Sequence, residues 1–125
     1  MDRKLILSQH FLQGSSIVKG KVMLPGSKSI TNRVILLASL SKTATLIKNY
    51  LQSDDTSYMI KALINLGVVV EKMGNDLIVY GADKSFPIKK SELHLGNAGT
   101  AFRPLTAVLS FMNGRYKLSG VNRMH

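Results

Sequence analysis

The sequence predicts an α/β fold of the α+β kind, built from repeated β-α-β-α-β-β units. Short strand-like runs alternate along the chain with longer runs whose apolar residues recur every three to four positions, as on one face of a helix. A shift of the sequence by 70 residues places Gly26 on Gly96 and Arg33 on Arg103. Self-similarity at a fixed period indicates a repeated structural unit. We therefore expect one and a half units, with the chain ending midway through the second.

The first unit is expected to begin with a strand, a tight loop and a helix. Residues 20–24 alternate weakly between apolar and polar side chains, which indicates a strand, and Pro25 and Gly26 then interrupt the pattern. The strongly apolar run at residues 29–40 predicts a helix, and residues 44–50 predict the next strand.

A second helix is predicted between Ser53 and Gly67. Ser53 is a typical N-cap residue, and Asp54 and Asp55 after it would favour the positive end of the helix dipole. The apolar positions recur at helical spacing, namely Met59, Ala62, Leu63 and Leu66. Gly67 is the expected C-terminal stop.

The first unit is predicted to close with a hairpin, after which the pattern starts again. Residues 68–72 and 77–80 are strand-like and flank a short polar turn that contains glycine. A connector follows, and a strand at residues 93–95, a glycine-rich loop, a helix and a strand at residues 116–119 form the start of the second unit.

Composition favours an anionic partner and excludes several kinds of site. Seventeen Lys and Arg residues against seven Asp and Glu residues give a formal charge of +10, which attracts either nucleic acid or anionic metabolites. The basic residues never run longer than pairs, and aromatic residues make up only 6% of the chain. Both observations disfavour a nucleic-acid arm, although a basic RNA-binding module of β-α-β-α-β-β fold stays open as an alternative.

The chain contains no cysteine, and its three histidines lack metal-ligand spacing, so we expect neither thiol chemistry nor a metal site. It also has no uncharged apolar window of membrane-spanning length. We therefore expect a cytoplasmic protein without a membrane partner.

The first candidate site is the loop that precedes the first predicted helix. Gly26 is followed by Lys28 and Ser29, and free backbone N–H groups at a helix N-terminus favour an anion. Ser29 and Arg33 lie four residues apart on one helical face, so one phosphate could meet a hydroxyl, an ammonium and a guanidinium. The alternative is that Ser27 or Ser29 only caps the helix while the cations extend into solvent.

The second candidate site is the glycine-rich loop at residues 95–100. Its small residues would let backbone N–H groups approach a ligand, and Arg103 follows in the first turns of the helix. The alternative is a tight turn that uses glycine for positive φ and Asn97 or Thr100 as a cap. Arg123, after the last predicted strand, could clamp a carboxylate, but a surface arginine is the more common finding.

Four segments, in this order, resemble those of one known family: PGSKSITNR at residues 25–33, LQSDD at 51–55, LGNAGTAFRP at 95–104 and GVNRM at 120–124. From about residue 20 to residue 124, the chain resembles the N-terminal part of members of the 5-enolpyruvylshikimate-3-phosphate synthase family. The resemblance implies an enolpyruvyl transferase that joins the 5-hydroxyl of shikimate 3-phosphate to C2 of phosphoenolpyruvate and then eliminates phosphate, without a metal or organic cofactor.

The resemblance also implies roles for individual residues. Lys28 would be the catalytic residue in this part of the enzyme, because it lies between the two substrate anions. Shikimate 3-phosphate would be held by Lys28, Ser29 and Arg33, and phosphoenolpyruvate by Lys28, Gly99 and Arg123, with Asn97, Thr100 and Arg103 shaping the wall. Preorganised cations of this kind would stabilise the charge that develops at C2.

Two residues depart from the family's usual pattern, but neither change removes a contact group: Phe102 stands where methionine is common, and Asn122 where proline is common. By the resemblance, residues 1–24 would be a strand segment of the first domain, and residues 25–125 would be the first one and a half units of the second. The proton-transfer groups would lie further along the chain. The fragment alone is therefore expected to be inactive.

The resemblance further implies a glyphosate target, an intact enzyme that is a monomer, and a fragment that associates with itself or with the remaining C-terminal part of the enzyme. Within the same fold, the alternative is the cell-wall enolpyruvyl transferase that uses a UDP-sugar. That enzyme lacks the serine-lysine-serine loop followed by Asn-Arg.

Overall fold

The structure is a computed structural model that describes residue 14, residue 17 and residues 19–124. Its elements, in chain order, are α1 (Lys28–Ser39), β1 (Ala44–Ile47), α2 (Asp54–Asn65), β2 (Val69–Met73), β3 (Asp76–Tyr80), β4 (Lys90–His94), α3 (Gly99–Ser110), β5 (Arg115–Ser119) and the short 3₁₀ helix η1 (Asn122–Met124). The mixture of helices and strands confirms the predicted α/β class.

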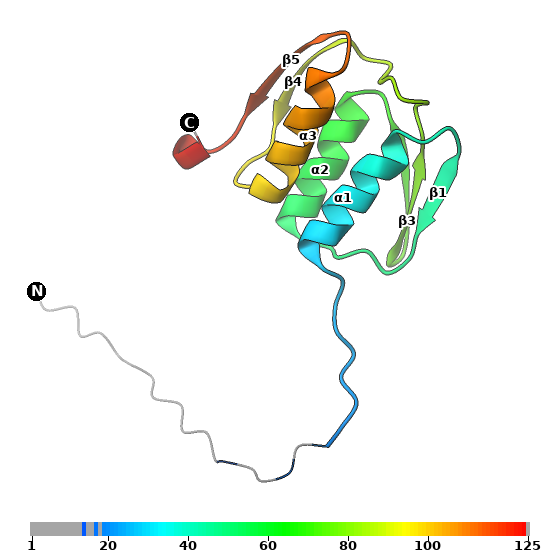
Figure 1. Cartoon of the computed structure of the whole chain (residues 1–125), viewed down its shortest axis with the longest axis vertical. Coiled ribbons are helices and arrows are strands. Elements are labelled where there is room, and N and C mark those ends of the chain that lie inside the picture. Colours follow the sequence, from blue (N-terminus) through cyan, green and yellow to red (C-terminus); the bar gives the residue numbers. More distant parts are fainter. Residues whose placement is uncertain (1–13, 15–16, 18, 125) are drawn as a thin grey trace, which may run out of the picture.

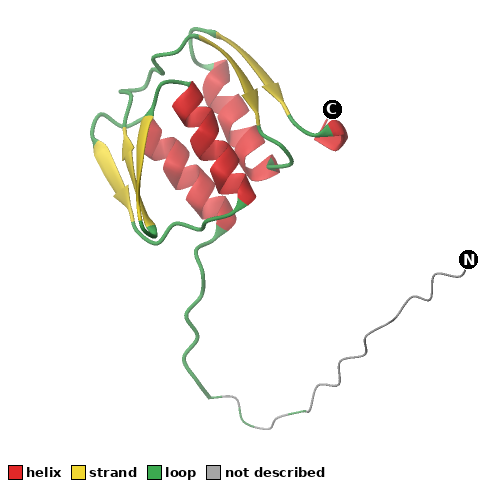
Figure 2. Ribbon diagram, turned by 180° about the vertical axis from the view of Figure 1, so that it is seen from behind, coloured by secondary structure: helices red, strands yellow, loops and turns green. Residues whose placement is uncertain are grey.

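The three helices lie side by side, with the two small sheets on either side of them (Figures 1 and 2). One sheet has the order β1-β3-β2 and is antiparallel throughout, and its β2–β3 hairpin confirms the turn predicted there. The other sheet pairs β4 with β5 in parallel, which requires a crossover connection, and α3 supplies it.

The core lies between the helices and the sheets. Each helix contributes a fully buried side chain to it, namely Ile35 from α1, Leu63 from α2 and Leu105 from α3. The apolar positions predicted along α2 are buried as well. These buried side chains of the three helices therefore point inward.

The helix ends of α2 follow the sequence prediction closely. Ser53 is the N-cap, and it forms a reciprocal capping box with Thr56. Gly67 has a φ of +90°, the left-handed backbone conformation with which a glycine ends a helix. Pro104 lies inside α3, because that helix begins five residues earlier, at Gly99. The buried face of α3, with Ala101 and Leu105, compensates for the backbone hydrogen bond that proline cannot donate.

The predicted strand at residues 20–24 is wrong. The structure assigns no strand there, and Val22, Met23 and Leu24 are largely exposed. Alternation is a local property, whereas a strand needs a hydrogen-bonded neighbour, and no described strand pairs with this segment. The assignment of residues 1–24 to another domain falls mostly outside the described residues.

β1 is also shorter than predicted and ends at Ile47. Asn49 takes a φ of +48°, which turns the chain, and its backbone N–H donates to Asp76 Oδ1 at 2.8 Å. The remaining strand limits differ from the prediction by a few residues.

Gly96 is expected to be intolerant of a side chain. Its φ is +54°, and a Cβ there would lie 2.3 Å from the ring of Tyr58 on α2. Gly96→Ala should therefore cost about 1–3 kcal/mol of unfolding free energy from overpacking, in addition to backbone strain. Gly74→Ala is the matched control, because Gly74 has a φ of +59° but open space around it. Urea unfolding of both variants checks this, and equal losses would contradict the proposed clash.

Candidate functional site

The N-termini of the three helices meet at one end of the molecule. Figure 1 shows α1, α2 and α3 running in the same general direction, with their first turns together. Lys28 is the first residue of α1, Asp55 the second residue of α2, and Gly99 the first residue of α3. Because each helix carries a partial positive charge at its N-terminus, the three dipoles together favour an anion at this place.

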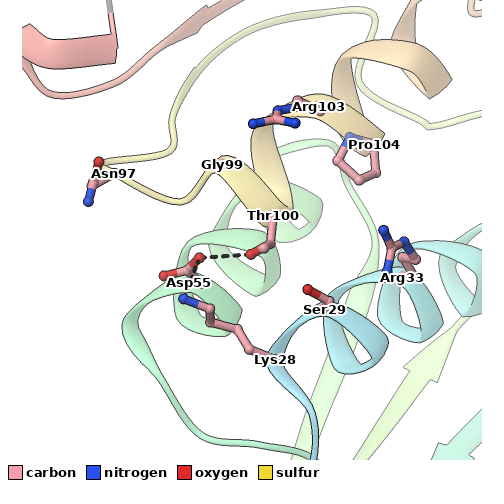
Figure 3. Close-up of a pocket in the computed structure, with 9 residues that line it drawn as sticks. All are labelled: Lys28, Ser29, Arg33, Asp55, Asn97, Gly99, Thr100, Arg103 and Pro104. Atoms are coloured by element: carbon pink, nitrogen blue, oxygen red, sulfur yellow. Dashed lines mark hydrogen bonds and ion pairs between the residues drawn. The ribbon is translucent and has the colours of Figure 1, made fainter.

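A pocket of about 400 Å³ lies at this end, a size typical of small-molecule sites. It is lined by Lys28, Ser29, Arg33, Asp55, Asn97, Gly99, Thr100, Arg103 and Pro104 (Figure 3). Of the site residues predicted from the sequence, all except Arg123 therefore line one pocket, although the chain separates them into two distant loops.

The N-termini of α1 and α3 are not capped by side chains. Ser27, the N-cap of α1, and Ala98, the N-cap of α3, make no side-chain capping hydrogen bond. The capping alternatives for Ser27, Ser29, Asn97 and Thr100 are therefore not realised, whereas the tight turn with positive φ expected of the glycine-rich loop is present at Gly96. The N-terminus of α2 differs, since its capping box satisfies its own backbone groups. An anion in the pocket would thus meet open N-termini from α1 and α3.

Lys28 is held by a carboxylate that the sequence prediction did not include in the site. Its ammonium lies 3.4 Å from Asp55 Oδ2, with the lysine side chain 47% exposed and that of Asp55 19% exposed. The hydroxyl of Thr100 donates to the same Asp55 oxygen at 2.7 Å (Figure 3). Asp55 was interpreted only as a favourable charge for the helix dipole. Its place in the second family-like segment was the signal that could have identified it.

Arg123 is not among the lining residues of the pocket, but it contacts one of them. Its Nε donates to Asn97 Oδ1 at 2.7 Å, which links η1 to the glycine-rich loop. Arg33 and Arg103, which the internal repeat makes equivalent, both line the pocket. The two loops thus face each other across the site.

The electrostatics of the pocket suit a small molecule with more than one anionic group. Three cations, Lys28, Arg33 and Arg103, line it, against the single carboxylate of Asp55. Arginine binds phosphate or carboxylate through two parallel hydrogen bonds, and lysine provides a compact charge. Over the described residues, no group of three or more potential metal-ligating side chains was found. No described helix is long and apolar enough to cross a lipid bilayer.

Comparisons with known proteins point to a single family. The sequence model of the family described as EPSP synthase (3-phosphoshikimate 1-carboxyvinyltransferase) matches residues 12–125. A protein of Cellvibrio japonicus named 3-phosphoshikimate 1-carboxyvinyltransferase is 55% identical over 115 residues, which cover 91% of this chain and 27% of that protein. Its namesake from Cupriavidus taiwanensis is 58% identical over 106 residues, which cover 85% of this chain and 24% of the relative.

The fold agrees with these matches. A solved structure of EPSP synthase from Acinetobacter baumannii is similar to this chain with a TM-score of 0.72 at 25% identity, over 82% of this chain and 24% of the other. The chain spans about a quarter of the length of the curated relatives it matches. The named relatives carry the transferase name, so neither the RNA-binding module nor the UDP-sugar transferase is supported.

Proposed function

This chain belongs to the EPSP synthase family, and from that premise we propose that it forms part of an enzyme that transfers the enolpyruvyl group of phosphoenolpyruvate to shikimate 3-phosphate. In this reaction the 5-hydroxyl of shikimate 3-phosphate adds to C2 of phosphoenolpyruvate, and phosphate is then eliminated. The observation that carries the proposal is the pocket at the helix N-termini, where residues from separate family-like segments line one anion-binding site.

We assign shikimate 3-phosphate to Lys28, Ser29 and Arg33. Lys28 and Ser29 begin α1, whose first turn has no side-chain cap, so its backbone N–H groups are available to a phosphate. Arg33 lies one turn along the same helix and lines the same pocket. A hydroxyl, an ammonium and a guanidinium would then surround one phosphate group.

We assign phosphoenolpyruvate to Lys28, Gly99 and Arg123. A Cβ at Gly99 would meet no atom within 4 Å, which leaves room for a ligand beside the start of α3. Asn97, Thr100 and Arg103 would form the wall of this part of the site, with Asn97 also orienting Arg123 through their hydrogen bond. Lys28 would lie between the two anions and stabilise the charge redistribution at C2 as a preorganised cation.

The groups that transfer protons, and further arginines, would come from the rest of the enzyme. Large apolar side chains on this chain are exposed, among them Ile30 and Leu37 on α1 and Phe111 after α3. Exposed apolar surface usually has a partner, which supports association with the remaining part of the enzyme. A cytoplasmic location belongs to the same proposal, because both substrates are anions that do not cross a bilayer unaided.

A chimera tests the proposed function. This chain would replace the matching quarter of the Cellvibrio japonicus protein, and phosphate release would be measured with both substrates. We expect the chimera to be active and the purified chain alone to show no turnover, because the chain spans about a quarter of that relative's length. A folded but inactive chimera, beside an active parent protein, would contradict the proposal, and turnover by the chain alone would contradict the expected division of the site.

A further inference from the structure

Asn32 is a fully buried polar residue of α1, and its side-chain oxygen lacks a partner. Its exposed fraction is 0%, and over the described residues Oδ1 of Asn32 is the buried side-chain polar atom without a hydrogen bond. Leaving such an atom unpaired is destabilising. The residue therefore costs stability where an apolar side chain would not, which calls for a different explanation of its presence.

The amide nitrogen of Asn32 begins a chain of contacts that leads to the pocket. Nδ2 donates to Thr100 Oγ1 at 2.9 Å, and that hydroxyl donates to Asp55 Oδ2 at 2.7 Å. Asp55 Oδ2 in turn lies 3.4 Å from Lys28 Nζ. The contacts connect α1 to α3, α3 to α2, and α2 back to α1.

The directions of these hydrogen bonds are fixed by chemistry. An ionised carboxylate can only accept, so the single hydroxyl proton of Thr100 is used on Asp55. The hydroxyl oxygen can then only accept from its other neighbour, which must present an N–H group. Asn32 meets this requirement with its amide nitrogen, and its oxygen is left without a partner as a consequence.

From these contacts we propose that Asn32 is a positioning residue for Lys28 and acts through Thr100 and Asp55. Asn32 holds the Thr100 hydroxyl toward Asp55, and the carboxylate held in this way fixes the ammonium of a half-exposed lysine. A flexible side chain becomes a preorganised cation. The role of Lys28 toward substrate rests on the proposed function, but its fixation by Asn32 does not.

The test uses the 125-residue chain labelled with ¹⁵N and ¹³C, and reads the chemical shift of Lys28 Nζ without ligand. Asn32→Leu should move this signal in the same direction as Asp55→Asn. Ser39→Ala is the matched control, because Ser39 is also fully buried on α1, where its hydroxyl donates to Leu36 O at 2.6 Å. If the Lys28 signal in Asn32→Leu stays where it is in Ser39→Ala, the proposal is overturned.

Thr100→Val provides a second variant should the buried leucine prevent folding. It keeps the shape of Thr100 but removes the hydroxyl, and it should shift the Lys28 signal as Asp55→Asn does. If the Lys28 signal in Thr100→Val stays where it is in the unmodified chain, the proposal is overturned. Where Asn32→Leu folds, it should add no further shift in the Thr100→Val background. An equal further shift would mean that Asn32 acts by another route, and would also overturn the proposal.

A binding measurement separates this proposal from the proposed function. Titration with shikimate 3-phosphate should show affinity weakened roughly 3- to 10-fold in Asn32→Leu, which lies within the range of coupling between members of one hydrogen-bond network. Failure of the unmodified chain to bind shikimate 3-phosphate would count against the assigned substrate. The ligand-free Lys28 signal would still decide whether Asn32 positions the lysine.

Discussion

Replacement of Lys28 by methionine is expected to lower kcat/KM about 10²- to 10³-fold in the chimera, while the fold stays intact. Lys28 begins α1 and lines the pocket, with its ammonium 3.4 Å from Asp55 Oδ2. Methionine keeps the length of the lysine stem and removes the charged ammonium. Removing one preorganised cation from the site of the transition state costs roughly 3 to 4 kcal/mol.

Steady-state kinetics beside a thermal melt would measure both quantities. The control is Lys61→Met, because Lys61 is exposed on α2 and does not line the pocket. Surface substitutions usually change stability by less than about 0.5 kcal/mol, and the control should leave kcat/KM within a few-fold of the parent. Near-normal kinetics for both substrates in Lys28→Met would refute the assigned role.

Gly99→Ala in the chimera should weaken the binding of phosphoenolpyruvate. It should also weaken the binding of glyphosate, which by the family resemblance would occupy the same site, and so relieve its inhibition. The added methyl group would meet no protein atom within 4 Å, so it would extend into space that the ligands use. One methyl group in a closely fitted pocket changes binding by about 10- to 200-fold. The unfolding free energy should be unchanged, in contrast to the loss expected for Gly96→Ala.

The KM for phosphoenolpyruvate and the inhibition constant for glyphosate would be measured for Gly99→Ala, together with its thermal melt. Unchanged inhibition would show that Gly99 does not line the ligand space. A large loss of stability would show instead that the start of α3 is packed more tightly than its surroundings indicate.

The sequence predicted the helices and the hairpin well because their signals are local. Ser53 and Gly67 mark the two ends of α2, and both act there as expected. The prediction of a strand at residues 20–24 failed because strand pairing depends on a neighbouring strand, which no local sequence pattern reveals. Pro104 would ordinarily mark a helix boundary, but the packing of Ala101 and Leu105 keeps five helical residues before it in α3.

The candidate site was predicted in large part, because glycine-rich loops and basic residues at helix starts have a recognisable chemistry. Lys28, Gly99 and Arg103 do line one pocket. Asp55 and Asn32 were missed for different reasons. A carboxylate at a helix N-terminus already has an ordinary explanation, and a buried asparagine shows its role only through the Thr100 hydroxyl, which lies 68 positions away in the sequence.

The meeting of three helix N-termini also bears on local unfolding. Lys28, Asp55 and Gly99 come from three different helices, so a bound ligand is lost if any one of these helices opens. A ligand that binds only the closed form raises the free energy of opening by about 2.7 kcal/mol at 100 times its Kd. A ligand in the site would therefore raise the free energy of opening of α1, α2 and α3 together. It would do so although α1 packs on the three-stranded sheet and α3 on the two-stranded sheet. A substrate bound at the proposed site would stabilise the fold around it as well as react.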